Sequence, residues 1–289
     1  MNKPRSSGFW SLFVVLAVAV GFALSSRAQS GDEIINSIGM KFVSVPRGSF
    51  EMGSAEDERY RRDDEKLHTV QISQPYWLST YEVTQRQFEQ VMGTNPSFFS
   101  ATGVGRVKVR PKEAPLHPVE GATWNQAAEF CEKLSAREDE KGRKFTYRLP
   151  TEAEWEWACR AGTSAPLYYG RDISSHELNF NGIGPLGRGR TGPFLRATFA
   201  IGGYRPNAFG LYDMHGNVAE WCSDWHSSDY YRDSPKLDPK GPASGEEKVV
   251  RGGGWANSAR ECRSAARNHF PPNFSSYAIG FRVVLIEGE

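Results

Sequence analysis

Three stretches of the chain combine a polar start with apolar residues at helical spacing. Each begins with a threonine that is followed three residues later by glutamine or glutamate. In this arrangement the hydroxyl accepts from an early backbone N–H, and the longer side chain reaches back to the start of the helix. Apolar residues then recur at intervals of three and four, which buries one helical face. The pattern predicts helices that begin after Thr84, Thr123 and Thr151, the first ending at Gly93 and the third at Gly162.

Short apolar segments bounded by turn residues predict strands at both ends of the chain. Residues 42–46 and 48–53 indicate two strands around a tight turn, and residues 280–285 indicate a terminal strand. Residues 55–68 carry mixed charge without apolar periodicity, which favours a solvated loop, with a binding role as the alternative. The glycine-rich residues 182–192 predict a long irregular loop.

Composition favours a single α+β domain that is rich in loops. The 289 residues include 29 Gly, 17 Pro and 8 Trp, so turns are frequent and large rings fill the core. This mixture suits such a domain better than a helical bundle or repeated βαβ units. Lys and Arg number 35 against 34 Asp and Glu, a net charge of +1. This balance offers no general attraction to nucleic acid or to an anionic membrane.

The first 28 residues are typical of an export signal. Lys3 and Arg5 are basic, residues 9–24 are mostly apolar without charge, and Ser26 and Ala28 place small residues at a cleavage site. We therefore expect an exported chain, periplasmic or secreted, whose mature form begins near Gln29 and has no membrane span. The alternative is an uncleaved N-terminal membrane anchor, because the apolar run is long for a signal peptide.

The chain has four cysteines, and an even number favours disulfides in an oxidising compartment, where four allow three pairings. None of them has zinc-finger spacing: they are Cys131, Cys159, Cys222 and Cys262. His215 and His226 lie eleven residues apart, with Asp224 near the second. No third histidine has supporting spacing, so we predict no iron or copper site from them.

Long motifs along the chain carry a resemblance to a known family. Residues 147–157 read Y-R-L-P-T-E-A-E-W-E-W, residues 210–221 read G-L-Y-D-M-H-G-N-V-A-E-W, and residues 280–282 read G-F-R. Over residues 36–286 the sequence resembles the formylglycine-generating enzymes, or sulfatase-modifying factors. The resemblance implies a duplicated C-type-lectin-like fold with little regular secondary structure and with bound calcium. It also implies a disulfide between Cys159 and Cys262, because the helix and the segment that carry them pack together in that fold.

Enzymes of this family oxidise a cysteine of an unfolded sulfatase to formylglycine, and they hold copper(I) between two cysteines after an R-G-G-S segment. Here Asn257 stands at the first of these cysteines, Gly254 replaces the serine, and Cys262 is a weak candidate for the second. Copper(I) is soft and prefers two thiolates, which an amide oxygen cannot replace. We therefore expect no copper. The resemblance also assigns Gly254, Asn257 and Arg267 to a substrate groove, with a salt bridge as the alternative role of Arg267.

The resemblance and the residue types together predict a calcium site at residues 213–220. Asp213 and Glu220 can supply carboxylates, while Gly216 and Val218 can present carbonyls, and calcium prefers such oxygen ligands. Glu220 precedes a tryptophan in a stretch expected to be core, where an unpaired carboxylate would be costly. The alternative is a turn with Glu220 solvated. A second calcium site near Asn179 is a weaker prediction.

Three functions are consistent with these patterns. The first is an exported family member, expected to be a monomer, that acts on or binds a protein or peptide without copper-dependent oxidation. The second is a calcium-stabilised lectin-like binding module. The third is a true formylglycine-generating oxidase that activates sulfatases, against which the residue at Asn257 argues. The catalytic residues, if the chain is an enzyme, are not identified by the sequence.

Overall fold

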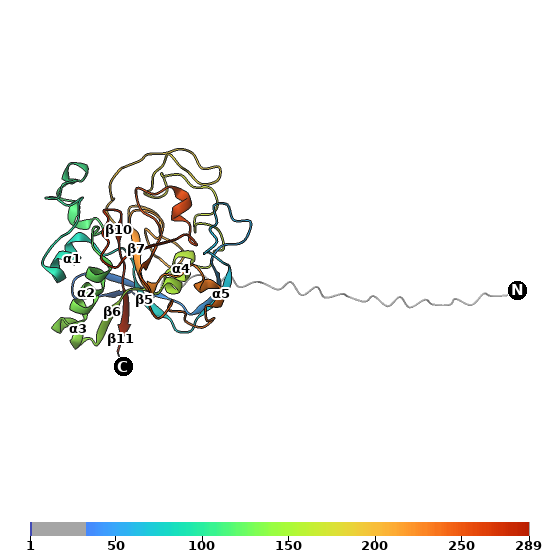
Figure 1. The fold of residues 1–289 in the computed structure, drawn as a ribbon, viewed down its shortest axis with the longest axis horizontal. Coiled ribbons are helices and arrows are strands. Elements are labelled where there is room, and N and C mark those ends of the chain that lie inside the picture. Colours follow the sequence, from blue (N-terminus) through green and yellow to red (C-terminus); the bar gives the residue numbers. More distant parts are fainter. Residues whose placement is uncertain (2–32, 289) are drawn as a thin grey trace.

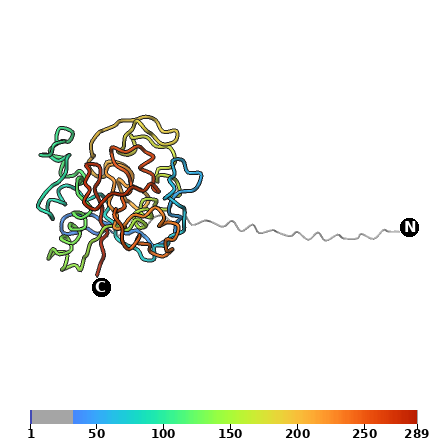
Figure 2. Tube along the Cα trace, in the orientation of Figure 1, coloured from blue at the N-terminus to red at the C-terminus, as the bar shows by residue number. Residues whose placement is uncertain are grey.

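The computed structural model describes residue 1 and residues 33–288, so the predicted export signal lies outside the described residues apart from Met1. Five strands form an antiparallel sheet whose middle is occupied by strands from both ends of the chain. In spatial order they are β1 (Glu33–Ile35), β2 (Lys41–Val45), β5 (Tyr76–Ser79), β11 (Val284–Glu287) and β6 (Phe145–Arg148). The strand β11, close to the C-terminus, lies between β5 and β6 and pairs with both (Figures 1 and 2).

Two further sheets complete the strand structure. The four-stranded sheet has the order β10 (Ile279–Gly280), β7 (Ala219–Trp225), β8 (Lys248–Arg251) and β9 (Arg267–Phe270). In this sheet β10 runs parallel to β7 and the other pairs are antiparallel. A two-stranded sheet joins β3 (Gly48–Met52) to β4 (His68–Ile72). The predicted hairpin is therefore wrong in its pairing: β2 and β3 both form, but they belong to different sheets.

Helices are few and short. They are α1 (Gln85–Met92), α2 (Trp124–Ser135), α3 (Glu138–Gly142), α4 (Glu152–Arg160), α5 (Tyr230–Asp233) and the 3-10 turns η1 (Arg106–Lys108), η2 (Ala114–Leu116) and η3 (Ala259–Cys262). All three predicted capping boxes are present, because in each the threonine side chain accepts from the N3 backbone and the N3 side chain reaches back. The third helix ends one residue earlier than predicted, with Ala161 in the left-handed conformation at a φ of 45°.

The core consists of two main apolar clusters on either side of the five-stranded sheet's central strands. One gathers around α1 and α2, where Phe88 stacks on Phe130 at 5.7 Å between ring centroids and Phe281 meets both rings edge-on. The other surrounds α4, with Trp155 fully buried. Figure 1 shows α1, α2 and α3 gathered on one side of the body, while the irregular segment after α4 runs along the top of the view.

Four arginines have at most 1% of their surface exposed, and each faces a buried glutamate. The pairs are Arg251 with Glu156, Arg263 with Glu65, Arg267 with Glu152, and Arg282 with Glu220. Because Glu65 lies in the charged segment 55–68, that segment is anchored to the body and is not the fully solvated loop that its composition predicts.

The terminal strand predicted over residues 280–285 is interrupted, since residues 281–283 separate β10 from β11. No helix within residues 33–288 has both the length and the apolar character needed to cross a bilayer.

Candidate functional site

The glycine-rich segment after β8 folds into a tight turn closed by Asn257. The Gly254 N–H donates to the Asn257 side-chain Oδ1 at 2.9 Å, and the Asn257 N–H donates to the Gly254 carbonyl at 2.9 Å. The Asn257 carbonyl in turn accepts from the Asn181 N–H at 2.8 Å. Gly254 and Asn257, which the resemblance assigns to one groove, are thus in direct contact. The amide oxygen of Asn257, where the resemblance expects the first copper cysteine, stabilises this turn.

Gly254 has no room for a side chain. A Cβ there would lie 2.7 Å from the Ala278 carbonyl oxygen and 3.2 Å from the Ala219 nitrogen, both of which are backbone atoms. Such contacts are shorter than van der Waals packing allows, so the backbone would have to shift. The serine that the resemblance places here cannot be accommodated in this arrangement of the turn.

Cys262 is a buried thiol at the end of η3. Its residue is fully buried, and it packs with the apolar cluster that contains Leu167, Phe180 and Leu186. Burial raises the pKa of this thiol above its ordinary value, and the same cause raises the pKa of the other three thiols, Cys131, Cys159 and Cys222.

The predicted disulfide between Cys159 and Cys262 is absent from the structure, in which all four cysteines are free. His215 contacts both residues instead. Its two ring nitrogens lie 3.8 and 3.7 Å from the Cys159 Sγ, and its Nδ1 lies 2.7 Å from the Cys262 carbonyl oxygen. The helix α4 and residues 262–267 do pack together, as expected: they meet directly through the ion pair of Glu152 with Arg267, while the His215 ring lies between Cys159 and the Cys262 carbonyl.

Cys159 and His215 are not an activated nucleophile pair, although they touch. Burial raises the pKa of the Cys159 thiol to about 12 and lowers the pKa of His215 to about 3. Both groups are therefore neutral near pH 7. Cysteine nucleophiles act as thiolates and need an electropositive, partly exposed site. This pair is structural.

Arg267 does not line an open groove. Its side chain is 1% exposed, and its Nε and Nη2 donate to the two oxygens of Glu152 at 2.8 and 2.9 Å. The guanidinium also lies 4.0 Å from the centre of the Tyr231 ring. In this structure Arg267 forms the salt bridge that was the alternative to a role in the groove.

Glu220, the carboxylate predicted to bind calcium, is neutralised by Arg282. The Arg282 Nε and Nη2 donate to its two oxygens at 2.7 and 2.8 Å, and the Trp155 indole N–H donates at 2.7 Å. Asp213 accepts from the Gly202 N–H at 2.8 Å. The argument that Glu220 requires a metal ion to compensate its charge therefore fails, since a buried guanidinium already does so.

The surroundings of Glu220 nevertheless contain more buried carboxyl groups than cations. We call Glu82, Asp213 and Glu220 the acidic cluster, and Arg282 is the cation that faces it. Burial raises the pKa of Asp213 to about 6, and burial with repulsion from Asp213 and Glu220 raises that of Glu82 well above its usual range. In the same region the Asn179 Oδ1 is buried without a hydrogen-bond partner. Oxygen-rich sites with excess negative charge are those that calcium prefers.

Aromatic side chains form a surface beside the turn that Asn257 closes. Trp255 stacks on Tyr277 and on Phe194 with ring centroids 6.0 and 6.1 Å apart, and Phe98 lies 5.0 Å from Tyr277. Tyr277 is 51% exposed, whereas Trp255 is 8% exposed and donates its indole N–H to the Tyr277 carbonyl. We call Phe98, Phe194, Trp255 and Tyr277 the aromatic surface. Sequence reasoning missed it, because its members come from four separate segments of the chain.

A groove of about 690 Å³ lies elsewhere on the described chain. It follows β5 and β11, and its rim carries the ion pair between Arg148 and Glu154 together with Lys240. None of the residues predicted to bind copper, calcium or substrate lines it. The groove therefore adds nothing to the interpretation of the Gly254–Asn257 turn.

The α+β architecture and the glycine-rich turn after β8 together define a class of protein, the sulfatase-modifying factors. The family model described as "Sulfatase-modifying factor enzyme 1-like domain" matches residues 35–286. The chain is also 34% identical over 295 residues to the formylglycine-generating enzyme of Streptomyces coelicolor, covering 83% of this chain and 87% of that protein. The chain belongs to this family, as its motifs predict.

Other relatives differ in their described roles. A protein of Paenibacillus barcinonensis named chaperone protein LppX is 27% identical, over 95% of this chain and 98% of its own length. The serine/threonine-protein kinase pkn1 of Chlamydia pneumoniae is 32% identical over 84% of this chain, and the match spans 37% of that kinase. Membership of the family therefore does not by itself assign an oxidase activity.

Solved structures confirm the fold. The structure of PvdO from Pseudomonas aeruginosa superposes with a TM-score of 0.72 at 27% identity, covering 89% of this chain and 98% of that one. Treponema denticola variable protein 1 superposes with a TM-score of 0.67 at 30% identity, covering 88% and 98%. The predicted α+β fold of the formylglycine-generating enzymes is thus confirmed.

Proposed function

We propose that this chain is an exported member of the family that binds an extended protein or peptide segment at the aromatic surface, without copper-dependent oxidation of a cysteine. The observation that carries the proposal is the turn at Asn257, where an amide oxygen caps the Gly254 N–H at the position of a copper thiolate. An amide is a hard ligand, so a copper(I) site with two thiolates cannot form there.

The aromatic surface supports the binding part of the proposal. Exposed tyrosine over buried tryptophan supplies a large apolar area at a small cost in side-chain entropy, and such residues are enriched at binding hot spots. Tyr277 is the exposed member, and its ring packs against those of Trp255 and Phe99 with centroids 6.0 and 6.4 Å away. The relative that is named a chaperone also favours a protein partner. The export signal predicted in residues 1–28 favours a site of action outside the cytoplasm.

The proposal predicts binding of peptides without their oxidation. The purified chain is presented with an array of extended peptides that includes the C-x-P-x-R sulfatase motif, with copper and oxygen supplied. Mass spectrometry should find every peptide cysteine unchanged, and a subset of peptides should bind saturably. Tyr277→Ala should weaken that binding by about tenfold, as is typical of the loss of one aromatic hot spot.

The matched control is Tyr60→Ala, because Tyr60 is similarly exposed but lies in the 55–68 segment away from the aromatic surface. It should bind as the unchanged chain does. Conversion of the motif cysteine to formylglycine would identify a genuine oxidase and refute the copper argument. Equal weakening by both substitutions, or no saturable binding across the array, would refute the binding site.

A calcium-stabilised lectin-like module is the second candidate, and the three carboxyl groups that the acidic cluster gathers around one arginine favour it. Elemental analysis of the purified chain should then find calcium, and EGTA should lower the melting temperature. An ion present at 100 times its dissociation constant contributes about 2.7 kcal/mol of stability. Asp213→Asn should remove the EGTA effect, whereas Asp172→Asn, at an exposed carboxylate paired with Arg188, should retain it. Absence of calcium together with an unchanged melting temperature would contradict the module.

A further inference from the structure

A cluster of metal-ligating side chains lies on the four-stranded sheet, at its β7–β8–β9 end. His226 follows the last residue of β7, Glu247 precedes the first residue of β8, and His269 lies within β9. The backbone fixes their relative positions, because the His226 N–H donates to the Glu247 carbonyl at 2.8 Å and Val249 pairs with His269 across the strands. We call His226, Glu247 and His269 the histidine cluster.

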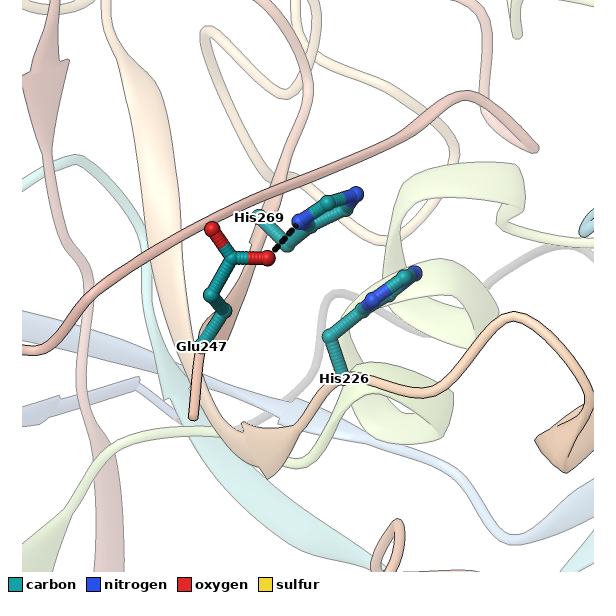
Figure 3. A group of neighbouring side chains, drawn as sticks. All are labelled: His226, Glu247 and His269. Atoms are coloured by element: carbon teal, nitrogen blue, oxygen red, sulfur yellow. Dashed lines mark hydrogen bonds and ion pairs between the residues drawn. The ribbon is translucent and has the colours of Figure 1, made fainter. Parts of the chain in front are cut away.

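The three side chains converge on one another (Figure 3). One ligand atom from each lies within 4.8 Å of the others. The Glu247 carboxylate contacts the His269 Nδ1 at 2.5 Å, and the rings of His226 and His269 lie face to face with centroids 3.7 Å apart. Two imidazoles and a carboxylate, on β9 and at the adjacent ends of β7 and β8, thus bring nitrogen and oxygen ligands together.

The second observation concerns His226 itself. Its side chain is only 10% exposed, and its buried Nε2 has no hydrogen-bond partner. The closest acid is Asp64, whose Oδ2 lies 3.5 Å from that nitrogen. At this position the Asp64 carboxylate can orient the His226 ring from its Nε2 side, which leaves Nδ1 as the nitrogen available to a metal ion.

The geometry points to a binding site for one divalent transition-metal ion of the zinc type in the histidine cluster, with Asp64 supporting His226. Imidazole nitrogen with carboxylate oxygen suits zinc, nickel and copper(II), whereas calcium prefers oxygen alone. Ligand atoms around one tetrahedral zinc lie roughly 3.3 Å apart, given bonds of about 2.0–2.1 Å. Binding therefore requires the two stacked rings, whose planes lie 12° from parallel, to rotate about their side-chain bonds so that one nitrogen of each points at the ion. Because Asp64 belongs to the 55–68 segment, the ion would link that segment to three strands of the sheet.

The test is a titration of the untagged chain, first freed of transition metals, with Co²⁺ and then Zn²⁺ in the presence of excess Ca²⁺. We expect one equivalent of Co²⁺ to bind with the absorption spectrum of nitrogen and oxygen ligation, and one equivalent of Zn²⁺ to displace it. His226→Ala and His269→Ala should each lose this equivalent. Asp64→Asn should retain it with affinity lowered by about 10- to 100-fold, the usual effect of removing a carboxylate that orients a ligating histidine.

His176→Ala is the matched control, since His176 is exposed and lies outside the cluster. It should bind as the unchanged chain does, and the thermal unfolding of each metal-free variant checks that the fold is intact. The site is refuted if the unchanged chain binds no Co²⁺ saturably. It is equally refuted if correctly folded His226→Ala or His269→Ala retains the full equivalent. Excess Ca²⁺ keeps the acidic cluster out of the titration, so this result is independent of the calcium and peptide experiments.

Discussion

Replacing Arg282 with methionine should lower the free energy of unfolding by about 3–5 kcal/mol, which is the usual cost of leaving a buried charge without its partner. Arg282 is fully buried and provides the two hydrogen bonds that neutralise Glu220. It also donates to the backbone carbonyls of Ser79 and Tyr212 at 3.0 and 2.9 Å. Its removal therefore takes a cation from the Glu220 carboxylate and a hydrogen-bond donor from two backbone carbonyls in the core. Urea denaturation at pH 7 measures the effect.

The double variant Arg282→Met with Glu220→Gln separates charge from packing. Because it removes both charges, it should recover part of the lost stability. The exposed pair of Lys41 and Glu33 is the matched control, and Lys41→Met should change the stability little, since solvent screens such pairs. A single Arg282→Met variant as stable as the unchanged chain would contradict the assignment of Arg282 as the cation that compensates Glu220.

Local signals were the part of the fold that the sequence predicted well. Each capping box joins residues three positions apart, so its chemistry is complete within one helical turn and needs no knowledge of the rest of the chain. The pairing of strands has no such signal. Val43 pairs with Leu78, and Phe50 pairs with Val70, although residues 42–53 alone suggest a hairpin. The register is decided by burial against distant segments, which a short window of sequence does not contain.

The same distinction explains the outcome at the candidate sites. The expectation that Asn257 excludes copper rests on the ligand chemistry of one residue type, which is local and known, and it stays a prediction. The burial of Arg267 could not, since Glu152 approaches it from a helix 115 positions away. The histidine cluster was missed for a related reason: it depends on the register of β8 with β9, which places His269 beside Glu247. Residue type suggests a chemistry, and tertiary pairing determines which partners are available for it.

Asp224→Asn should make the chain's stability less dependent on pH between about pH 4 and pH 8. Burial, with repulsion from Glu152, raises the pKa of the Asp224 carboxyl to about 7 from an ordinary value of 3.8. The folded chain therefore binds this proton more tightly than the unfolded chain does. The resulting stability is fully present below about pH 4 and is lost as the pH rises through about 7. The shift corresponds to about 4 kcal/mol, an upper estimate for one group.

Asparagine suits this test because it remains neutral and keeps an oxygen that can accept from the Glu152 N–H, as the Asp224 Oδ2 does at 2.9 Å. Relative to the unchanged chain, the variant should be equally stable or slightly less stable at pH 4 and more stable at pH 8, by urea denaturation at both values. Asp172→Asn should show the opposite trend on a small scale, because hydrogen bonds and charge from Arg188 lower the pKa of that exposed carboxyl. If the stability difference between Asp224→Asn and the unchanged chain is constant from pH 4 to pH 8, then Asp224 keeps an ordinary pKa in the folded chain. In that case some group other than the Glu152 N–H and the Ser223 hydroxyl, which donate to Asp224, must compensate its charge.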